Sequence, residues 1–509
     1  MKRAFCLHGH FYQPPREDPW TNEIEPQSSA APFHDWNERI FQECYKPNSE
    51  AVIVDQHDNV IRKVNNFEHC SFNFGPSLLS WIMKKHPKTY ARIIDADRRS
   101  LLKHNGHGNA IAMAYNHMIM PLANERDKIT QVKWGIEDFR FHFGRMPEAM
   151  WLPETACDMA TVEVLINEGI KFILLDPSQA DLVRKTPRGK WYDASTSLQS
   201  GIPYKCFSQE NSHKFINIFF YDGPLSKNLA FDDHIFESYK LLRRIEDTAY
   251  PPNASEHLIC AALDGETFGH HKKYTERTIA YLFDDLLPAT DIRQVNFGQY
   301  LEENSGKQEV IIKSGPSGEG TSWSCTHGVG RWKENCGCGT SSENPSQEWR
   351  MPLRMGLNEL RDNIWKIYVE ASASFFKDPE AARNDYIRVL LDPSFESASE
   401  FLYRNSQRYL TADESEYCIR LLEMQKFSMF MFTSCGWFFS DISGIEAIQN
   451  MRYAARAIEL AQEVSGTDPE PKFLEWLSFA QSNIASNGTG RDIYLKNVLH
   501  MKNGHEPFK

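Results

Sequence analysis

The chain has 509 residues and a mass of 58.8 kDa, which is enough for more than one domain. Hydrophobic residues make up 41% and charged residues 24%, and these ordinary globular values exclude extensive disorder. Acidic residues outnumber basic ones by 68 to 56, so the net charge of −12 excludes binding to nucleic acid or anionic membrane by bulk electrostatics. We therefore expect an uncharged polymer, or a neutral or cationic small molecule, as the partner.

Two features of the sequence concern where the protein resides. No apolar run reaches the ~18 residues that a bilayer-spanning helix needs, and the apolar stretch at 4–7 is too short for a signal-peptide core. The eleven cysteines are an odd number, which argues against a full disulfide framework. We predict a cytoplasmic protein and leave its oligomeric state open.

The first part of the chain alternates between strand-like and helix-like patterns. Five short apolar runs end in polar or acidic residues and are predicted to be buried strands, at 4–7, 149–152, 171–175, 215–221 and 258–263. Helical patterns lie between them, at 77–85, 128–143 and 159–168. This alternation predicts a β/α barrel, in which polar residues at the carboxyl ends of the strands carry the chemistry.

The pattern changes after residue 303. Residues 304–347 are rich in Gly, Ser, Cys and Asn and are predicted to form a loop-rich insert near the active site. Beyond them, apolar residues recur at helical spacing in Leu353, Leu357, Leu360, Ile364 and Ile367, and further helices are predicted at 413–432 and 445–464. We therefore expect three regions, a catalytic barrel at 1–303, the insert at 304–347 and an α-helical domain at 348–509.

Two strand ends carry candidate catalytic carboxylates. Trp151-Leu-Pro-Glu154 places a carboxylate after a strand, beside an aromatic wall and after a proline that fixes the backbone. Leu263-Asp264-Gly-Glu266-Thr-Phe268-Gly-His270 places two carboxylates after another strand, of which one could face the barrel mouth and the other support it. The alternatives are a solvated loop for the first segment and a capped loop with ion pairs to Lys272 and Lys273 for the second.

Histidines accompany these carboxylates in two further segments. His8-Gly-His10-Phe-Tyr-Gln13 ends the first strand, and its two imidazoles could bind a metal or donate hydrogen bonds to sugar hydroxyls. His107-Gly-Asn109 lies in a glycine-flanked turn that carries several hydrogen-bonding groups. We predict no metal at the active site and no cofactor.

Together these residues resemble glycoside hydrolase family 57, in the subgroup with a C-terminal helical domain of undefined function. The resemblance covers roughly residues 1–300, with a looser match to about 460, and rests on His10-Phe-Tyr-Gln13-Pro14, on Trp151 with Glu154, and on Asp264, Glu266, Phe268 and Gly269. It implies an α/β fold, a distorted (β/α)7-type barrel followed by a helical C-terminal domain. It also implies a retaining enzyme that acts on α-glucans, as an amylase, a glucanotransferase or a branching enzyme.

The same resemblance implies the roles of the site residues. Glu154 would be the nucleophile and Asp264 the general acid/base, with their carboxyl groups about 5–6 Å apart. A cationic His10 or His107 near Glu154 would favour its ionised form. Substrate contacts are expected from the strand-end residues and from the later segments, namely His8, His10, Gln13, His107, Asn109, Trp151, Glu266, Phe268, His270, Trp323, His327, Trp437 and Asp441.

The chain departs from the family pattern in two motifs. The second motif usually includes a Gly-Gln and a Glu, where this sequence has Gly106-His107-Gly108-Asn109. The fifth motif, which supplies an Asp and a Trp, is matched loosely by Ser434-Cys-Gly-Trp437-Phe-Phe-Ser-Asp441. Trp437 or Asp441 would then reach the cleft, and a helix-capping turn is the alternative.

A cysteine cluster in the insert has three possible interpretations. Cys325, His327, Cys336 and Cys338 match the ligand types of a Cys₃His zinc site, although their spacing is tighter than usual. The same residues could form a disulfide or redox pair. We favour the third interpretation, an active-site loop whose Trp323, His327, Arg331 and Trp332 contact substrate.

Two other classes of function compete with the leading one. A metal-dependent hydrolase on a related barrel, such as a polysaccharide deacetylase or an α-mannosidase-like enzyme, would bind its ion through His8, His10 and Asp264 and leave Glu154 without a role. A carbohydrate-binding or regulatory protein on a decayed enzyme fold would not need both carboxylates. We therefore expect an oligosaccharide or polysaccharide substrate and retaining glycosidase chemistry.

Overall fold

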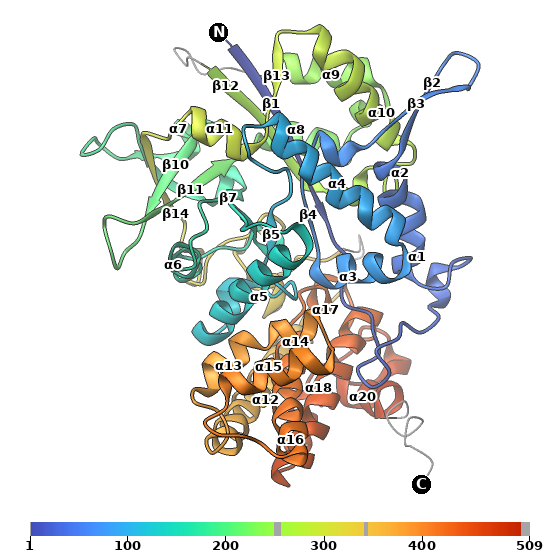
Figure 1. The fold of residues 1–509 in the computed structure, drawn as a ribbon, viewed down its shortest axis with the longest axis vertical. Coiled ribbons are helices and arrows are strands. Elements are labelled where there is room, and N and C mark those ends of the chain that lie inside the picture. Colours follow the sequence, from blue (N-terminus) through green and yellow to red (C-terminus); the bar gives the residue numbers. More distant parts are fainter. Residues whose placement is uncertain (1, 249–255, 341–344, 500–509) are drawn as a thin grey trace. The chain divides into compact units, whose positions relative to one another are not determined.

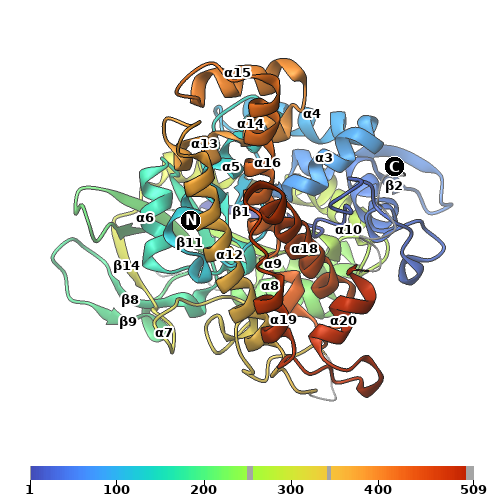
Figure 2. The same cartoon turned by 90° about the horizontal axis from the view of Figure 1, so that it is seen from below.

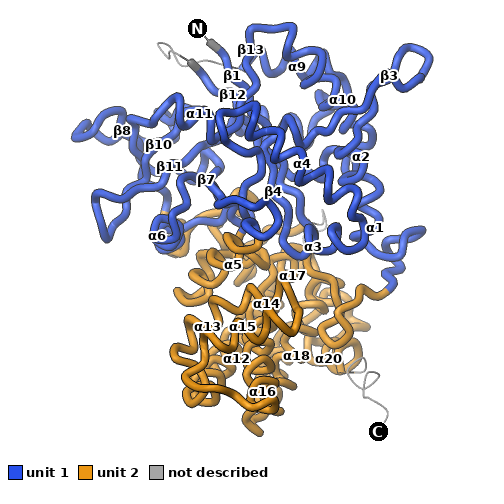
Figure 3. Tube along the Cα trace, viewed as in Figure 1, with its two compact units in different colours: residues 1–13, 26–113, 139–313 blue, residues 14–25, 114–138, 314–509 orange. Residues whose placement is uncertain are grey.

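The computed structural model describes residues 2–248, 256–340 and 345–499. It forms two compact units (Figure 3). The first, here called the barrel unit, contains Met1–Gln13, Pro26–Met113 and Phe139–Lys313. The second, here called the helical unit, contains Pro14–Glu25, Ala114–Asp138 and Ser314–Lys509. Two segments from the first third of the chain therefore belong to the helical unit, which the sequence did not indicate.

A ring of parallel strands forms the centre of the barrel unit, and most of these strands are labelled in Figure 1. Continuous ladders join β12 to β1, β1 to β4, β5 to β6 and β7 to β11. Single bridges join β4 to β5 and β6 to β7, and the Asp222 N–H donates to the Cys260 carbonyl at 2.7 Å to join the end of β11 to β12. The strands are β1 Lys2–Phe11, β4 Ser71–Phe74, β5 Ala112–Met113, β6 Met150–Trp151, β7 Phe172–Leu175, β11 Phe215–Phe220 and β12 Glu256–Asp264.

This ring confirms the distorted (β/α)7 barrel that the sequence predicted. The distortion comes from β5 and β6, which are only two residues long. The apolar runs form strands because both faces are covered, and every residue of β4 and β7 is buried. Strand β1 is longer than predicted, so His8 and His10 lie within it. Strands β4 and β5 were not predicted from the sequence, since neither is a long apolar run.

Helices surround the ring and begin at the carboxyl ends of several strands. Asp158 accepts a hydrogen bond from the Thr161 N–H at the start of α6, and Asp222 accepts one from the Leu225 N–H at the start of α8. The predicted helices at 77–85, 128–143 and 159–168 correspond to α3, α5 and α6. The helices of the barrel unit are α1 Trp36–Ile40, α2 Lys46–Ser49, α3 Pro76–Lys85, α4 Pro87–Lys103, α6 Met159–Asn167, α7 Ala194–Ser197, α8 Gly223–Phe231, α9 Ser238–Glu246, α10 Thr275–Tyr281 and α11 Phe297–Glu303, whereas α5 Glu125–Phe143 belongs mostly to the helical unit.

Smaller strands extend the barrel unit. A six-stranded sheet in the order β7-β11-β10-β14-β8-β9 adds four strands beyond the ring, and β13 pairs with the beginning of β1. A separate hairpin is formed by β2 and β3. These strands are β2 Ala51–Val54, β3 Val60–Val64, β8 Ala180–Arg184, β9 Tyr192–Asp193, β10 Pro203–Phe207, β13 Ile292–Gln294 and β14 Gln308–Ile312. Strand β14 lies in the segment that was predicted to be loop.

The helical unit is built around α12, α16 and α18, which pack against one another (Figure 2). The predicted apolar face of α12 is buried, with Leu353, Leu357 and Ile364 fully inside. The segment 114–138 is held by a buried ion pair, in which Arg383 Nη1 lies 2.7 Å from Asp127 Oδ1. The helices are α12 Arg350–Ser372, α13 Pro379–Asp385, α14 Ile387–Leu391, α15 Phe395–Asn405, α16 Ala412–Phe430, α17 Cys435–Phe438, α18 Ile445–Ser465, α19 Glu470–Leu477 and α20 Gly490–Asn497. Among the described helices of the whole chain, none has the length and apolar character needed to span a bilayer.

Candidate active site

The carboxyl ends of the ring strands bring together polar residues that are far apart in the sequence. His10 on β1 lies opposite Asp264 on β12 and, on its other side, opposite Asn73 on β4. Gly265, directly after β12, must be small, because a Cβ there would lie 2.4 Å from the Phe11 ring. The close approach of β1 and β12 therefore depends on this glycine.

Aromatic rings form one wall of this end of the barrel. Trp151 is fully buried and stacks on His8 and His10, with ring centroids 4.8 Å and 5.0 Å away. His8 Nδ1 lies 3.0 Å from Ser71 Oγ, and His8 Nε2 lies 3.2 Å from Asn73 Oδ1. The Asn73 amide nitrogen donates to His10 Nδ1 at 3.0 Å. These contacts fix both imidazole rings against Trp151.

Both histidines of this wall are neutral at physiological pH. Burial and, to a lesser extent, the neighbouring His10 together lower the pKa of His8 to about 3. Burial also lowers the pKa of His10 to about 4. The expectation that a cationic His10 favours ionised Glu154 is therefore wrong, because this imidazole is too deeply buried to hold a proton.

Glu154 lies in a strained turn after β6. It has φ = 57°, and the next residue, Thr155, has φ = 50°. Two consecutive left-handed residues that are not glycine cost roughly 1–3 kcal/mol each. Gln179 stabilises the turn, because its amide oxygen accepts from Thr155 Oγ1 at 2.9 Å and its amide nitrogen donates to the Thr155 carbonyl at 2.8 Å. The Glu154 side chain remains partly exposed.

Asp264 combines an exposed side chain with protein packed densely around it. Desolvation by this surrounding protein and, to a lesser extent, the negative charge of Glu154 together raise the pKa of its carboxyl group to about 7. The two carboxyl groups therefore interact electrostatically, although 110 residues separate them. A carboxylic acid with a pKa near neutrality, accessible to solvent, can hold and release a proton at physiological pH.

Glu266 is a buried neighbour of this pair. Desolvation raises the pKa of Glu266 to about 8, and the charge of Asp264 adds to this effect. Its Oε1 accepts from the Tyr45 hydroxyl at 2.6 Å and from the Tyr12 N–H at 2.9 Å. Gln13 in turn hydrogen bonds to the Tyr45 hydroxyl. The arrangement makes Glu266 and Gln13 parts of a supporting network around Tyr45.

The sequence analysis missed several residues at this end of the barrel. The Tyr221 hydroxyl donates to Asp176 Oδ2 at 2.7 Å, and the charges of Asp176 and Asp264 both act on Tyr221. Asp176 directly follows the predicted strand 171–175 and Tyr221 ends the predicted strand 215–221, so the strand-end rule that selected Glu154 would also have found them. Asn73 and Tyr45 gave no such signal, because β4 was not predicted and Tyr45 follows no strand.

His107 and Asn109 lie away from this site. They precede β5 and are therefore at the amino end of the ring. His107 Nδ1 lies 2.7 Å from Glu148 Oε2, and its Nε2 lies 3.2 Å from Glu302 Oε2. Asn109 is buried and accepts from the Asn296 amide at 3.1 Å. This placement does not support the predicted substrate contacts, since residues at the amino end of a barrel stabilise the fold.

Phe268 and His270 lie on the loop after β12. Phe268 is buried, and its carbonyl accepts from the Asn48 amide at 2.7 Å. His270 pairs with Glu43 and packs edge-on against Trp36. These contacts anchor the loop after β12, which carries Glu266.

Two residues predicted from the fifth motif are structural in the helical unit. Trp437 is fully buried, its indole N–H donates to the Arg350 carbonyl at 3.3 Å, and the Arg354 guanidinium lies over its ring. Asp441 accepts from Ser443, Ser482 and the Asn483 N–H. Asp441 therefore holds a turn before α18 but does not cap a helix, since the N-cap of α18 is Gly444 and makes no side-chain cap hydrogen bond. Trp323 is half-buried and His327 is exposed.

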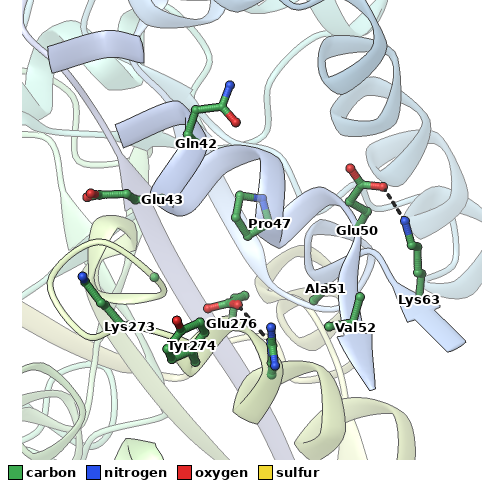
Figure 4. Close-up of a pocket in the computed structure, with 12 residues that line it drawn as sticks. Gln42, Glu43, Pro47, Glu50, Ala51, Val52, Lys63, Lys273, Tyr274 and Glu276 are labelled. Atoms are coloured by element: carbon green, nitrogen blue, oxygen red, sulfur yellow. Dashed lines mark hydrogen bonds and ion pairs between the residues drawn. The ribbon is translucent and has the colours of Figure 1, made fainter. Parts of the chain in front are cut away.

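A pocket of about 420 Å³ lies elsewhere in the barrel unit (Figure 4). It is lined by residues of α2, β2, β3 and α10, with acidic and basic side chains interspersed. Glu50 pairs with Lys63 and Glu276 with Arg277 at its edge. Neither Glu154 nor Asp264 lines this pocket, so it is separate from the candidate active site.

The alternative with a metal at the strand ends is disfavoured by the ligand geometry. Both ring nitrogens of His8 already contact protein groups. In the described ranges, His8, His10 and Asp264 are not among the groups of side chains whose donor atoms gather closely enough to hold an ion. Glu154, which a metal mechanism leaves unused, interacts with Asp264 instead.

The barrel unit is a parallel β/α barrel with an electrostatically coupled Glu and Asp at its strand ends, beside an aromatic wall. These features define the class of barrel glycosidases. Over residues 4–310, more than half of its length, the chain matches the model of glycosyl hydrolase family 57, and it belongs to this family. Residues 346–506 match a domain of unknown function, DUF3536. The family and the C-terminal domain that the sequence implied are thus confirmed.

Solved structures show the same fold at low identity. An exo-type maltose-forming amylase of Pyrococcus sp. ST04 is 15% identical, with a TM-score of 0.70 over 93% of this chain and 83% of that one. A branching enzyme of the same family from Thermococcus kodakaraensis is 13% identical, with a TM-score of 0.53 over 98% of this chain and 96% of that one. Alpha-amylase 1 of Dictyoglomus thermophilum is 25% identical over 135 residues, which are 25% of this chain and only 19% of that protein.

Proposed function

We propose that the protein is a retaining α-glucan-active enzyme in which Glu154 is the nucleophile and Asp264 the general acid/base. The observation that carries this proposal is the electrostatic interaction between them: desolvation and, to a lesser extent, the negative charge of Glu154 together raise the pKa of the accessible Asp264 carboxyl group to about 7. Such a pair provides one ionised and one protonated carboxyl group at the same pH, as double displacement at a sugar requires.

The chemistry proceeds in two steps. Glu154 attacks the anomeric carbon while Asp264 donates its proton to the departing glycosidic oxygen, so that a glycosyl ester forms on Glu154. Asp264, now ionised, takes a proton from the incoming water or sugar hydroxyl, and attack by that oxygen breaks the ester. Two inversions retain the anomeric configuration. The acceptor decides between hydrolysis and glycosyl transfer.

The proposed substrate class is supported by the relatives. The similar proteins include a maltose-forming amylase, an alpha-amylase and a branching enzyme. The net charge of −12 fits an uncharged polymer better than an acidic one. The proposal assigns catalysis to the barrel and keeps the cytoplasm as the predicted location.

The first experiment identifies the reaction. Purified protein is incubated with maltooligosaccharides and with glycogen, and the products are separated by size and branching. Shorter chains indicate hydrolysis, longer chains transfer, and new branches a branching activity. Proton NMR of the first products should show the α-anomer, as retention demands. If neither substrate changes, the choice of α-glucans is wrong.

A second experiment tests the nucleophile directly. A slow fluorinated α-glucosyl donor should leave a covalent sugar on a peptide that contains Glu154, detected by mass spectrometry after digestion. The matched control is Glu148→Gln, which changes a carboxylate at the amino end of β6 and should still be labelled on Glu154. Labelling of another residue would contradict the assignment.

A further inference from the structure

We propose that Cys325, His327, Cys336 and Cys338 bind a structural zinc ion in the helical unit. These four residues precede α12, and within the fully described stretch 325–338 the only regular structure is a 3₁₀ turn at Gly330–Trp332. The barrel chemistry does not use them. The proposal is independent of the substrate and replaces both the expectation that no metal is bound and the interpretation of His327 as a substrate contact.

The four donor atoms lie close enough together to share one metal ion. They all lie within 4.8 Å of one another. Cys325 Sγ is 3.9 Å from Cys336 Sγ, and Cys338 Sγ is 3.6 Å from His327 Nδ1. With Zn–S near 2.3 Å and Zn–N near 2.0–2.1 Å, a regular tetrahedron requires edges of about 3.8 Å and about 3.6 Å. The separations therefore match zinc coordination, whereas a disulfide needs its two sulfurs at about 2.0 Å.

The backbone explains how such close sequence spacing brings the ligands together. Gly337 has φ = 80°, and this left-handed turn lets Cys336 and Cys338 direct their sulfurs to the same point. A Cβ on Gly330 would lie 3.1 Å from the Cys336 Cβ and 3.5 Å from the His327 Cβ. The turn therefore packs directly against the ligands. Glycine at these positions makes the unusual C-x-H and C-x-C spacing workable.

Backbone donors and a buried cation complete the surroundings. The N–H groups of His327 and Arg331 hydrogen bond to the Cys325 sulfur, as outer contacts to a metal ligand do. Arg350 is fully buried and donates to the Cys338 carbonyl at 2.8 Å, while its Nε and Nη2 have no hydrogen-bond partner within the described ranges. A buried guanidinium requires a nearby negative charge.

The zinc site supplies that charge. Three thiolates and one neutral imidazole around Zn²⁺ carry a net charge of −1, and the Cys325, Cys336 and Cys338 sulfurs are the negative neighbours of Arg350. Four protein ligands leave no open position for water, so the ion is structural rather than catalytic. It would cross-link the segment 325–338 next to the start of α12.

The test uses the full chain, expressed in zinc-supplemented medium and purified without chelator. We expect about one zinc per chain by elemental analysis, and less than about a tenth of that in Cys336→Ser and Cys338→Ser. Cys435→Ser, a half-buried cysteine of the same unit outside the cluster, is the matched control and should keep its zinc. Cobalt substitution should give the absorption bands of a tetrahedral thiolate site.

The wild-type protein alone can overturn the proposal, whatever the variants do. The proposal is wrong if purified wild-type protein lacks stoichiometric zinc, holds another metal in its place, or shows a Cys325–Cys336 disulfide in peptide mapping. It is also wrong if the serine variants retain full zinc. Zinc content is measured without substrate, and Glu154→Gln should keep its zinc, so failure of this proposal and failure of the proposed enzymatic function are distinguishable.

Discussion

Two aspartates that the sequence marked as site residues have opposite environments. Asp264, at the end of a barrel strand, has a pKa raised to about 7 by desolvation and by Glu154. Burial also acts to raise the pKa of Asp441, in the helical unit, but hydrogen bonds from Ser443, Asn483 and Ser482 outweigh it and lower the pKa. In Asp264 the ionised form is destabilised, so the carboxyl group can exchange a proton. In Asp441 the ionised form is stabilised, and the carboxylate fixes a loop.

The difference follows from architecture. Parallel strands in a closed ring end at one place, so polar residues that follow them converge even when they are distant in sequence. Turns between helices share no such common end, and their polar residues satisfy nearby backbone instead. A motif match is therefore a stronger indicator of chemistry at a barrel strand end than in a loop between helices.

The largest expected effect comes from Glu154→Gln. Because the amide cannot form the glycosyl ester, turnover of maltooligosaccharides should fall by at least about 10³-fold. Stopped assays on equal amounts of folded protein measure this, with Glu148→Gln as the control at the opposite strand end. If Glu154→Gln keeps appreciable turnover, or if Glu148→Gln loses as much, then the carboxyl end of the barrel is not distinguished from the amino end as the site of catalysis.

Asp264→Asn should lower turnover by roughly 10²–10⁴-fold, since the general acid is lost. In the wild type, Asp264 must be protonated to act as the general acid. Activity should therefore decline as the pH rises through about 7, the pKa of Asp264. In Glu154→Gln the charge that raises this pKa is gone, and the pKa should fall. The pH profile of kcat/KM and an NMR titration of the variant measure the two effects. A profile without an alkaline limb would contradict the assignment.

Glu266→Gln tests the supporting network. The change alters the carboxylate that accepts from Tyr45 and Tyr12, and misplacement of the adjacent loop should lower kcat roughly tenfold to hundredfold with little change in KM. Tyr45→Phe, which removes one hydroxyl, should have a smaller effect in the same direction. A rise in KM alone would instead make Glu266 a substrate-binding residue.

The smallest effect on activity is expected from Asp441→Asn. Because the pKa of Asp441 is lowered in the folded protein, this group stabilises the folded state at pH values above the ordinary aspartate pKa. The stabilisation is lost as the pH falls through the lower pKa that Asp441 has in the folded state. The variant should lose about 1 kcal/mol at pH 7, since partial exposure screens the charge, and nothing at low pH. Denaturant unfolding at two pH values measures this. A large loss of activity in folded protein would return Asp441 to the active site.

Much of the barrel could be predicted because its strands are apolar runs that end in polar residues. The strands β4 and β5 could not, since β4 alternates Phe with Ser and Asn, and β5 has only two residues. Glu154 and Asp264 were predicted as a pair, and the charge of Glu154 acts on Asp264. His107 and Asn109 lie at the amino end of the ring instead, which could not be foreseen because a glycine-flanked turn looks the same at either end of a strand. The neutral state of His10 depends on burial, which no local pattern reveals.

The sequence by itself determined the family, the barrel with its helical C-terminal domain, and the two carboxylates as the candidate catalytic pair. Apolar periodicity and short motifs are local properties, so they can be recognised without coordinates. Only the tertiary structure decided which strand end each polar residue occupies, that Asp264 has a pKa near neutrality, and that Cys325, His327, Cys336 and Cys338 converge within 4.8 Å. Electrostatic coupling and ligand geometry depend on distance through space, and the chain sets those distances only when it closes the barrel and folds the segment before α12.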